Sequence, residues 1–167
     1  MAPSAAVVGK VEIGESSTVW YGSVIRGDKN KVTIGDHTNV QDRSVIQCTV
    51  NAHLEVHNSQ GAFAPEVKIG NYVTIGHGAL LNSCTIGDNC LIGQGSVVQE
   101  GCEVRSNSMV AAGAVLLADT VVESNQLWGG NPAVFLRDVK TDELNFIRGV
   151  RILNIHVIHG ICYFLIV

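Results

Sequence analysis

Aliphatic residues recur along the chain at intervals of six. The series slips by three residues after Ile25, is interrupted after Ile46, and loses one position after Leu81. A period of six does not fit a helix, whose apolar spacing is near 3.6 residues, or a sandwich, whose strands are longer and alternate. The seventeen positions are Val7, Ile13, Val19, Ile25, Ile34, Val40, Ile46, Ile69, Ile75, Leu81, Ile86, Ile92, Val98, Val104, Val110, Leu116 and Val122.

Two further positions keep the same period. Glycine often follows the aliphatic residue, as at Gly35 and Gly76, and a small or β-branched residue stands four positions after it, as at Ser44 and Ala79. Such a unit is a short strand and a corner with two side chains pointing inward. Three units close one triangular turn, and turns stack at the strand spacing. The pattern therefore predicts a parallel β-helix of five to six turns, about 27 Å tall at ~4.8 Å per turn.

Three segments depart from the period. Residues 47–66 are expected to form a loop inserted at a corner, and residues 123–140 to leave the repeat. Thr141 is expected to cap a C-terminal helix whose apolar residues, Leu144 and Ile147, lie on the prism and cover strand edges at its free end. The chain thus divides into a β-helix over residues 1–140 and a helix with an apolar tail over residues 141–167. The tail, residues 152–167, is shorter than the ~20 residues that span a bilayer, so we expect it to bury against a partner, the prism or a membrane surface.

Composition narrows the function. The net charge is −4 and no Lys/Arg cluster occurs, so nucleic acid is not an expected partner. Five cysteines, an odd number without a secreted spacing, indicate reduced thiols. Cys90 and Cys102 fall on the small inward position, which predicts core residues rather than ligands. The N-terminus has neither the apolar run of a signal peptide nor an arginine-rich transit segment, so the residues themselves do not indicate a compartment.

The motifs beyond the repeat resemble a known family. The segments Trp20-Tyr21-Gly22-Ser23-Val24-Ile25-Arg26-Gly27-Asp28 and Thr38-Asn39-Val40-Gln41-Asp42 are similar to those of gamma-class carbonic anhydrases. Ile75-Gly76-His77 and Trp128-Gly129-Gly130-Asn131-Pro132-Ala133 agree with the mitochondrial branch of that family. The resemblance covers about residues 5–150. It implies a left-handed β-helix that trimerises, zinc held between subunits, and a place on the matrix arm of mitochondrial respiratory complex I, at the inner membrane.

The same resemblance implies where zinc ligands should stand. The family uses three histidines, and the matching positions here hold Gln47, His77 and Asn82. The first and third belong to one subunit and the second comes from its neighbour. Catalytic zinc needs three protein ligands and an open position, and a neutral amide is a poor donor beside imidazole. Without firm coordination no zinc-bound hydroxide forms at neutral pH, so the chain by itself is predicted to be inactive.

Other residues are candidates to replace the missing ligands or match further residues of the family's site. Cys48 adjoins the first lost ligand, but neighbouring strand residues point to opposite faces, so it is expected to turn inward. His53 and His57 in the inserted segment are expected to be solvated. Arg26 and Asp28 match a pair that bridges subunits, and Gln41 and Asp42 match residues beside the zinc-bound water; all four are interpreted mainly as structural. Glu55 and Glu66 are weak matches to the proton-shuttle residues of archaeal members.

Three hypotheses follow. The first is a non-catalytic assembly subunit, gamma-carbonic-anhydrase-like, in a trimer attached to complex I, where the tail contacts a membrane or partner protein. The second is a heterotrimer in which His77 completes, in trans, a zinc site for CO2 hydration held by a better-preserved relative; in a scaffold His77 is vestigial. The third is a hexapeptide acyltransferase that uses acetyl-coenzyme A and a histidine base. Whether the trimer is homomeric or heteromeric is left open by the residues.

Overall fold

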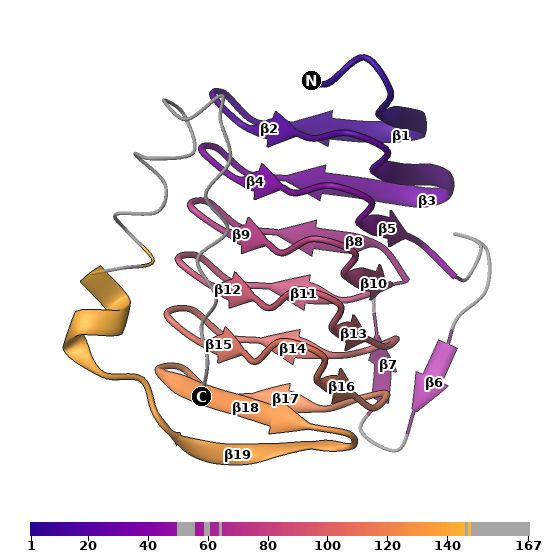
Figure 1. Cartoon of the computed structure of the whole chain (residues 1–167). Helices are drawn as coiled ribbons and strands as arrows, with labels where there is room; N and C mark the ends of the chain where they lie inside the picture. The colour runs from indigo at the N-terminus through magenta and orange to yellow at the C-terminus, as the bar shows by residue number, and fades with distance from the viewer. Residues whose placement is uncertain (50–55, 59–60, 64, 146, 148–167) are drawn as a thin grey trace.

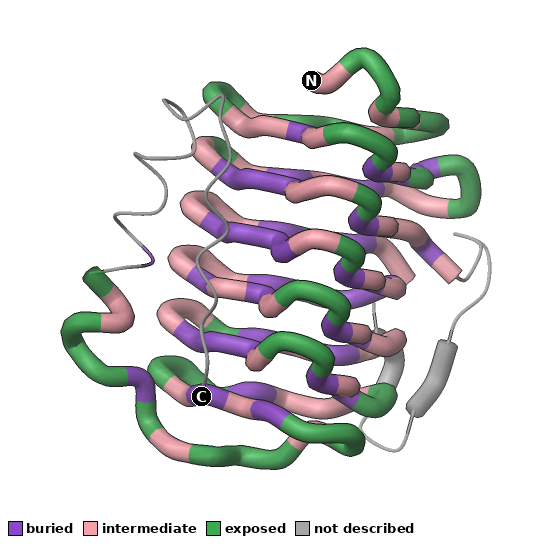
Figure 2. The backbone as a smooth tube through the Cα atoms, viewed as in Figure 1, coloured by how far each residue is buried: buried purple, intermediate pink, exposed green. Residues whose placement is uncertain are grey.

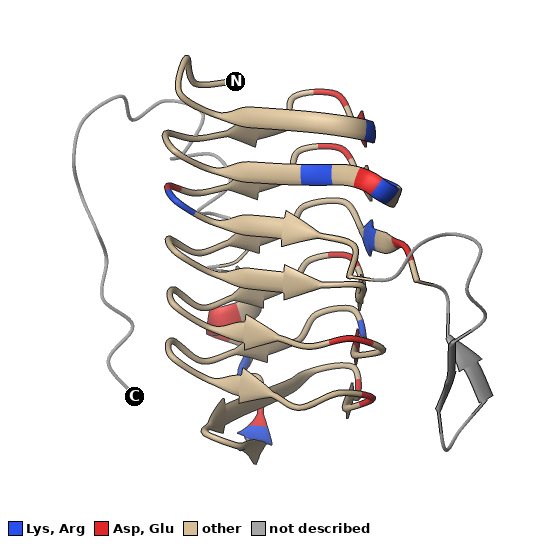
Figure 3. Cartoon of the chain, turned by 90° about the vertical axis from the view of Figure 1, so that its right-hand side faces the viewer, with Lys and Arg blue, Asp and Glu red and all other residues tan. Residues whose placement is uncertain are grey.

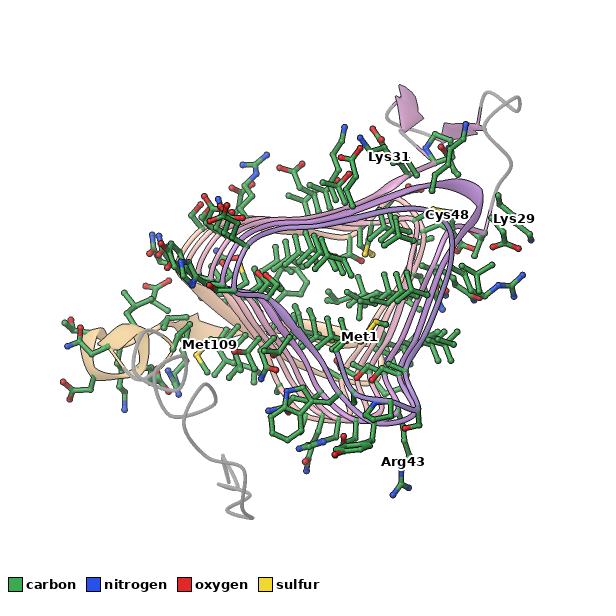
Figure 4. All side chains as sticks on the ribbon, turned by 90° about the horizontal axis from the view of Figure 1, so that it is seen from above. Met1, Lys29, Lys31, Arg43, Cys48 and Met109 are labelled. Carbon is green, nitrogen blue, oxygen red and sulfur yellow. The ribbon has the colours of Figure 1, made fainter. Side chains whose placement is uncertain are left out.

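The structure is a computed structural model, and it describes residues 1–49, 56–58, 61–63, 65–145 and 147. Predicted features that fall elsewhere, namely His53, Glu55, Cys162 and the tail 152–167, lie outside the described residues, as does the side chain of His57. The described chain winds into a stack of turns with the N-terminus at one end (Figure 1). Viewed along the stack it is a triangular prism with three flat faces (Figure 4). The predicted parallel β-helix is confirmed.

Two faces share the strands β1 (Ala6–Ile13) and β3 (Val24–Ile34), which bend around the corner between them. On face A the beginnings of β1 and β3 pair with a stack of short parallel strands: β5 (Val45–Gln47), β10 (Leu80–Asn82), β13 (Val97–Val98) and β16 (Val115–Leu116). On face B their ends continue into β8 (Val67–Ile69), β11 (Thr85–Ile86), β14 (Glu103–Val104) and β17 (Val121–Val122).

Face C is a separate sheet of six parallel strands and one antiparallel strand. Its parallel strands are β2 (Thr18–Val19), β4 (Asn39–Val40), β9 (Thr74–Ile75), β12 (Leu91–Ile92), β15 (Met109–Val110) and β18 (Gln126–Gly130). β19 (Ala133–Asp138) closes the sheet. Outside the prism, β6 (Val56–Asn58) and β7 (Gly61–Phe63) form a hairpin. No helix of the described chain is long and apolar enough to cross a membrane.

The core is the repeat itself. Every one of the seventeen periodic positions is buried except Val7 and Ile13, which lie on the first turn, where no further turn covers them (Figure 2). Val32 and Val67, which stand two residues before the periodic Ile34 and Ile69 on β3 and β8, add to the core. Cys48, Cys84, Cys90 and Cys102 are buried in the same core, as predicted for Cys90 and Cys102. The side chains that fill the prism are therefore mostly aliphatic or small (Figure 4), and Trp128 packs against them on the last turn.

The corners explain the glycines and the polar residues of the repeat. At the corner between faces B and C, a side-chain oxygen accepts a hydrogen bond from the backbone N–H one turn above: Asp36 from Glu15, Asn71 from Asp36, and Asp88 from Asn71, at 2.7–2.8 Å. At the corner between faces C and A, Gly76 passes so close to the next turn that a Cβ would lie 2.5 Å from the nitrogen of Gln94. A side chain there would force the turns apart.

The insertion is shorter than the expected 47–66. Gln47 still pairs with its neighbours in the β5 ladder, and Cys48 packs in the core. Ser83 ties the two ends of the insertion together, because its Oγ accepts from the backbone N–H of Thr49 and donates to the carbonyl of Pro65, both at 3.0 Å. The inserted segment therefore leaves the prism after residue 49 and returns at Pro65.

The expectation that residues 123–140 leave the repeat is wrong at its start. Trp128 pairs in parallel register with Val110, so the β-helix continues for one more strand. The signal was present, since Trp128 stands six residues after Val122, but an aromatic residue replaces the aliphatic one. β19 then folds back antiparallel on β18 and forms the last strand of face C. This hairpin, rather than the helix, protects that strand edge.

The short C-terminal helix, which begins at Thr141, lies on the side of the prism. As predicted, Leu144 and Ile147 face the prism, where they pack with Met109, Leu127 and Val139 on face C. The predicted cap is one residue too late: the carbonyl of Lys140 accepts the first helical hydrogen bonds, from Glu143 and Leu144. The Glu143 carboxylate in turn accepts from the Lys140 N–H at 2.8 Å, which is one half of a capping box.

Candidate degenerate metal site

Two amide side chains occupy neighbouring positions on the outer surface of face A. Gln47 ends β5 and Asn82 ends β10, and the two residues are direct partners in the parallel ladder. The Nε2 of Gln47 donates to the Oδ1 of Asn82 at 3.0 Å. The preceding residues, Ile46 and Leu81, are fully buried, so the alternation along each strand turns both amides outward. Each amide thereby meets part of the other's hydrogen-bonding capacity.

Arg26 lies one turn above, in register with Gln47. Its Nη2 donates to the Oδ2 of Asp28 at 2.7 Å, and both side chains are roughly two-fifths exposed. The hydrogen bond from Arg26 holds the pKa of Asp28 below its usual range, and the same contact raises the pKa of Arg26. Arg26 and Asp28 thus form a surface pair within one chain, and an exposed pair of this kind contributes little to stability by itself.

Cys48 does not replace the first ligand position. It turns into the core and is only 3% exposed. Its thiol lies against the carbonyl oxygens of Asn30 and Lys31, at 3.4 and 3.5 Å, and burial raises its pKa. A buried thiol with a raised pKa is a poor source of the thiolate that a metal requires.

His77 lies at the corner between faces C and A, in the turn between β9 and β10. Its Nδ1 is 3.4 Å from Oδ2 of Asp42, and both side chains are about one-third exposed. The other carboxylate oxygen of Asp42 accepts from the Tyr21 N–H at 2.9 Å, and the Asp42 carbonyl accepts from the Gly78 N–H at 2.8 Å. Asp42 is therefore held from the turns above and below, with one oxygen directed to the imidazole.

Gln41 precedes Asp42 at the same corner. Its backbone is bound on two sides, because its N–H donates to the carbonyl of Ile75 at 3.0 Å and its carbonyl accepts from the Ser23 hydroxyl at 2.7 Å. These contacts are to the backbone of Gln41, so any residue at this position would make them, and they do not explain the choice of glutamine.

Within one chain the structure does not bring the imidazole and the two amides together. His77 comes before β10 and Asn82 ends it, so they lie at opposite edges of face A. The labelled residues Arg43 and Cys48 mark these two edges as different vertices of the triangle (Figure 4). Among the described residues, no group of three or more His, Cys, Asp or Glu side chains could hold a metal ion. Glu66, a weak match to a proton shuttle, is paired with Lys68.

The residues of a single chain therefore do not fit a catalytic zinc ion. Two positions offer neutral amides that already bond to each other, and the imidazole lies at another corner. Zinc in catalytic sites takes three imidazole, thiolate or carboxylate ligands. No step of a zinc-dependent reaction can be derived from this arrangement within one subunit.

Face A also carries an aliphatic stripe that the sequence interpretation missed. The residues just before the inward positions on this face are half-buried, point outward and are in register from turn to turn: Val24, Val45, Leu80, Val97 and Val115. The corresponding positions on face B are mostly polar: Glu12, Thr33, Lys68, Thr85 and Glu103. Sorting the hexads by face would have revealed this difference. Figure 3 shows the strands of face A almost free of charged residues.

Comparison with known proteins finds relatives over most of the chain. Residues 6–152 match a family model described as Dynactin subunit 5. Gamma carbonic anhydrase 1, mitochondrial, of Arabidopsis thaliana is 45% identical over 88% of this chain and 51% of its own length. Gamma carbonic anhydrase-like 1, mitochondrial, of the same plant is 50% identical over 86% of this chain and 54% of its own length. The chain thus spans about half the length of these curated relatives.

A solved structure supports the fold. The hexapeptide transferase family protein from Anaplasma phagocytophilum has a TM-score of 0.76 and 33% identity, with 92% of this chain and 86% of that chain covered. The resemblance first indicated by Trp20–Asp28 and Thr38–Asp42 is therefore confirmed by relatives that match most of the chain. The chain belongs to the family of the model described as Dynactin subunit 5, and its close relatives are named gamma carbonic anhydrase and gamma carbonic anhydrase-like proteins.

Proposed function

We propose that this chain is a non-catalytic subunit of a trimer of gamma carbonic anhydrase-related chains, which serves the assembly of mitochondrial respiratory complex I on the matrix side of the inner membrane. The observation that carries the proposal is the hydrogen bond between Gln47 and Asn82. The β-helix is intact around these positions, while two ligand positions hold amides that satisfy each other. The names of the relatives, which include the word mitochondrial, support the compartment.

The chemistry of the amides argues against activity in an assembly of this chain alone. Imidazole is a much better ligand for zinc than a neutral amide oxygen. Without three firm ligands, the pKa of a metal-bound water is not brought near 7, and the hydroxide that attacks CO2 is not formed. A homotrimer of this chain would have the same two amides at each of its interfaces.

The outer surface of face A supports the proposal that this chain binds a related subunit. A half-exposed stripe of aliphatic residues, continuous over five turns, is the kind of surface that protein partners cover. Arg26 and Asp28 stand beside this stripe, and His77 lies at its other edge. A related subunit, built on the same ladder, would match the spacing of the stripe turn for turn.

A second candidate function rests on His77. This imidazole lies at the opposite edge of face A from the amides, so in this hypothesis it serves a neighbouring subunit rather than its own chain. In a heterotrimer, His77 would supply one zinc ligand to a neighbour that retains histidines at the positions of Gln47 and Asn82. Under this hypothesis the number of zinc ions per trimer equals the number of such neighbours.

A third candidate comes from the structural neighbour named as a hexapeptide transferase. The ladder of hexads is common to both classes, and His77 beside Asp42 could act as a general base in principle. Binding of labelled acetyl-coenzyme A at micromolar concentration would support this function. Absence of binding, with CO2 hydration also absent, would leave the assembly role.

The experiment that tests the proposal is purification of the native chain with its partners. We expect related gamma carbonic anhydrase chains and complex I membrane-arm proteins to be recovered with it. Zinc analysis of the same material separates the first two candidates. If His77 is vestigial, no zinc is expected near it. If His77 completes the site of a neighbouring subunit, zinc is expected there. A soluble homotrimer with tightly bound zinc would contradict the proposal.

A further inference from the structure

At the corner between faces C and A, one turn has a residue of a different type from the other turns. On each turn, one residue of this corner adopts the left-handed conformation, and on four turns that residue is glycine: Gly22, Gly78, Gly95 and Gly113. On the remaining turn between Gly22 and Gly78 the residue is Arg43, with a φ of 56°. A side chain with a Cβ is disfavoured in this region, and a long one without local hydrogen bonds gains nothing in return.

Arg43 projects away from the prism at this vertex (Figure 4). It is exposed, and it forms no ion pair within the part of the chain that the structure describes. Its backbone N–H donates to the carbonyl of Tyr21 at 2.9 Å, and Tyr21, one turn above, is 60% exposed. An exposed tyrosine and an arginine thus stand side by side on successive turns.

Stability of the isolated chain does not explain Arg43. Glycine is the residue that this corner uses elsewhere, and it adopts the left-handed conformation without steric cost. Strained residues persist where the surroundings or a function require them, and within the described chain Arg43 forms a hydrogen bond only through its backbone. Tyrosine and arginine are also the residue types that dominate the energetics of protein interfaces.

We infer that Tyr21 and Arg43 form a contact point that seats on a related subunit, with the guanidinium of Arg43 paired to a carboxylate of that subunit. The inference rests on the proposed function, because it names the partner as a chain of the same trimer. Charge supports an acidic acceptor: a copy of this chain has a net charge of −4. Arginine suits this role because its planar fork binds a carboxylate through two hydrogen bonds.

The test uses the full chain with Arg43→Gly, Arg43→Lys and, as a matched control, Ser16→Gly. Ser16 is also exposed and left-handed, with a φ of 56°, but it lies at the corner between faces B and C. Association is measured by sedimentation velocity over a concentration series, alone and with a related gamma carbonic anhydrase chain. Thermal unfolding is measured at a concentration below assembly.

We expect Arg43→Gly to raise the melting temperature by about 2 °C, because strain is removed, and to weaken association about tenfold. Arg43→Lys should give a smaller loss of association, because the charge remains and the fork is lost. Ser16→Gly should leave association unchanged. If wild-type chain assembles and Arg43→Gly assembles equally well, this inference is overturned while the proposed trimer stands. If wild-type chain assembles with neither partner, both are overturned.

Discussion

Gln47 and Asn82, thirty-five residues apart in the chain, are direct neighbours on face A, and the Nε2 of Gln47 donates to the Oδ1 of Asn82 at 3.0 Å. Their positions in the parallel ladder would place two imidazoles side by side if both residues were histidine. We therefore expect the double variant Gln47→His/Asn82→His to gain zinc, up to about one ion per chain in a trimer, because His77 of a neighbour supplies the third ligand. Inductively coupled plasma mass spectrometry of the purified assembly measures the gain.

The control for this gain is the triple variant in which His77→Ala is added. Loss of zinc in the triple variant is expected if the third ligand comes from His77, and equal zinc with and without His77 would show that the two new imidazoles bind the metal in another way. Each single variant, with one imidazole beside one amide, should bind little zinc.

Ile46 and Val45 are consecutive residues whose side chains point to opposite sides of face A. Ile46 is fully buried, so Ile46→Ala should lower the free energy of unfolding by about 2–5 kcal/mol through the cavity it leaves. Val45 is half-buried in the outer stripe, and Val45→Ala should cost roughly 1 kcal/mol or less in the separated chain. Urea denaturation measures both. Val45→Ala should also weaken assembly, and an undisturbed association constant would argue against face A as the interface.

Glu143 joins the C-terminal helix to β19 and also stabilises the first turn of that helix. Its carboxylate accepts two hydrogen bonds from the Arg137 guanidinium, at 2.7 and 2.8 Å, and one from the Lys140 N–H. The hydrogen bond from Arg137 is the main cause that lowers the pKa of Glu143 from 4.5 to about 2. Because the folded value is the lower one, the carboxylate stabilises the helix above pH 4.5, and this contribution is lost as the pH falls through about 2.

Hydrogen exchange at the Leu144 amide, which donates to the Lys140 carbonyl, reports this effect. We expect Glu143→Gln to reduce protection about fivefold at pH 7, and the difference from wild type to shrink as the pH is lowered from 4.5 toward 2. Asp142→Asn is the control, since Asp142 is exposed in the same turn. Equal effects of the two variants would contradict a specific role for Glu143.

Four cysteines lie in the interior of the prism, and their burial should make them unreactive. Burial raises the pKa of Cys90 to about 12 and that of Cys102 to about 11, and it raises the pKa of Cys84 further. Because the thiolate is the nucleophile, iodoacetamide at pH 8 should label peptides with these residues only after denaturation in urea. Peptide mass spectrometry distinguishes the sites. Rapid labelling of Cys90 in the native chain would contradict the packing described.

The fold could be predicted from the sequence because one position in six must place an aliphatic side chain in the core. The aliphatic side chains of Ile25, Ile46 and Leu81 must point inward. The period therefore also indicates whether the side chains of the adjacent residues point inward or outward. That is why the outward direction of Gln47 and Asn82 and the burial of Cys90 could be predicted. Trp128 was missed because it takes the inward position of the repeat with an aromatic side chain instead of an aliphatic one.

Other features depend on contacts between residues that are distant in the sequence, and the six-residue period does not predict such contacts. The hydrogen bond between Gln47 and Asn82 requires the register of β5 with β10 across the insertion, and the number of residues in the insertion does not determine that register. The cap at Lys140 depends on where Glu143 meets Arg137. Arg43 can be recognised as an exception only after the glycines of the other turns are aligned with it at one corner.

Zinc content and CO2 hydration of a homogeneous assembly of this chain, measured on the same sample, test the central claim most directly. We expect less than about 0.1 zinc per chain, because neutral amides bind the ion weakly, and a hydration rate no greater than that of buffer. About one zinc per chain together with rapid hydration would contradict it, since Gln47 and Asn82 would then have to support the chemistry that their mutual hydrogen bond is inferred to have replaced.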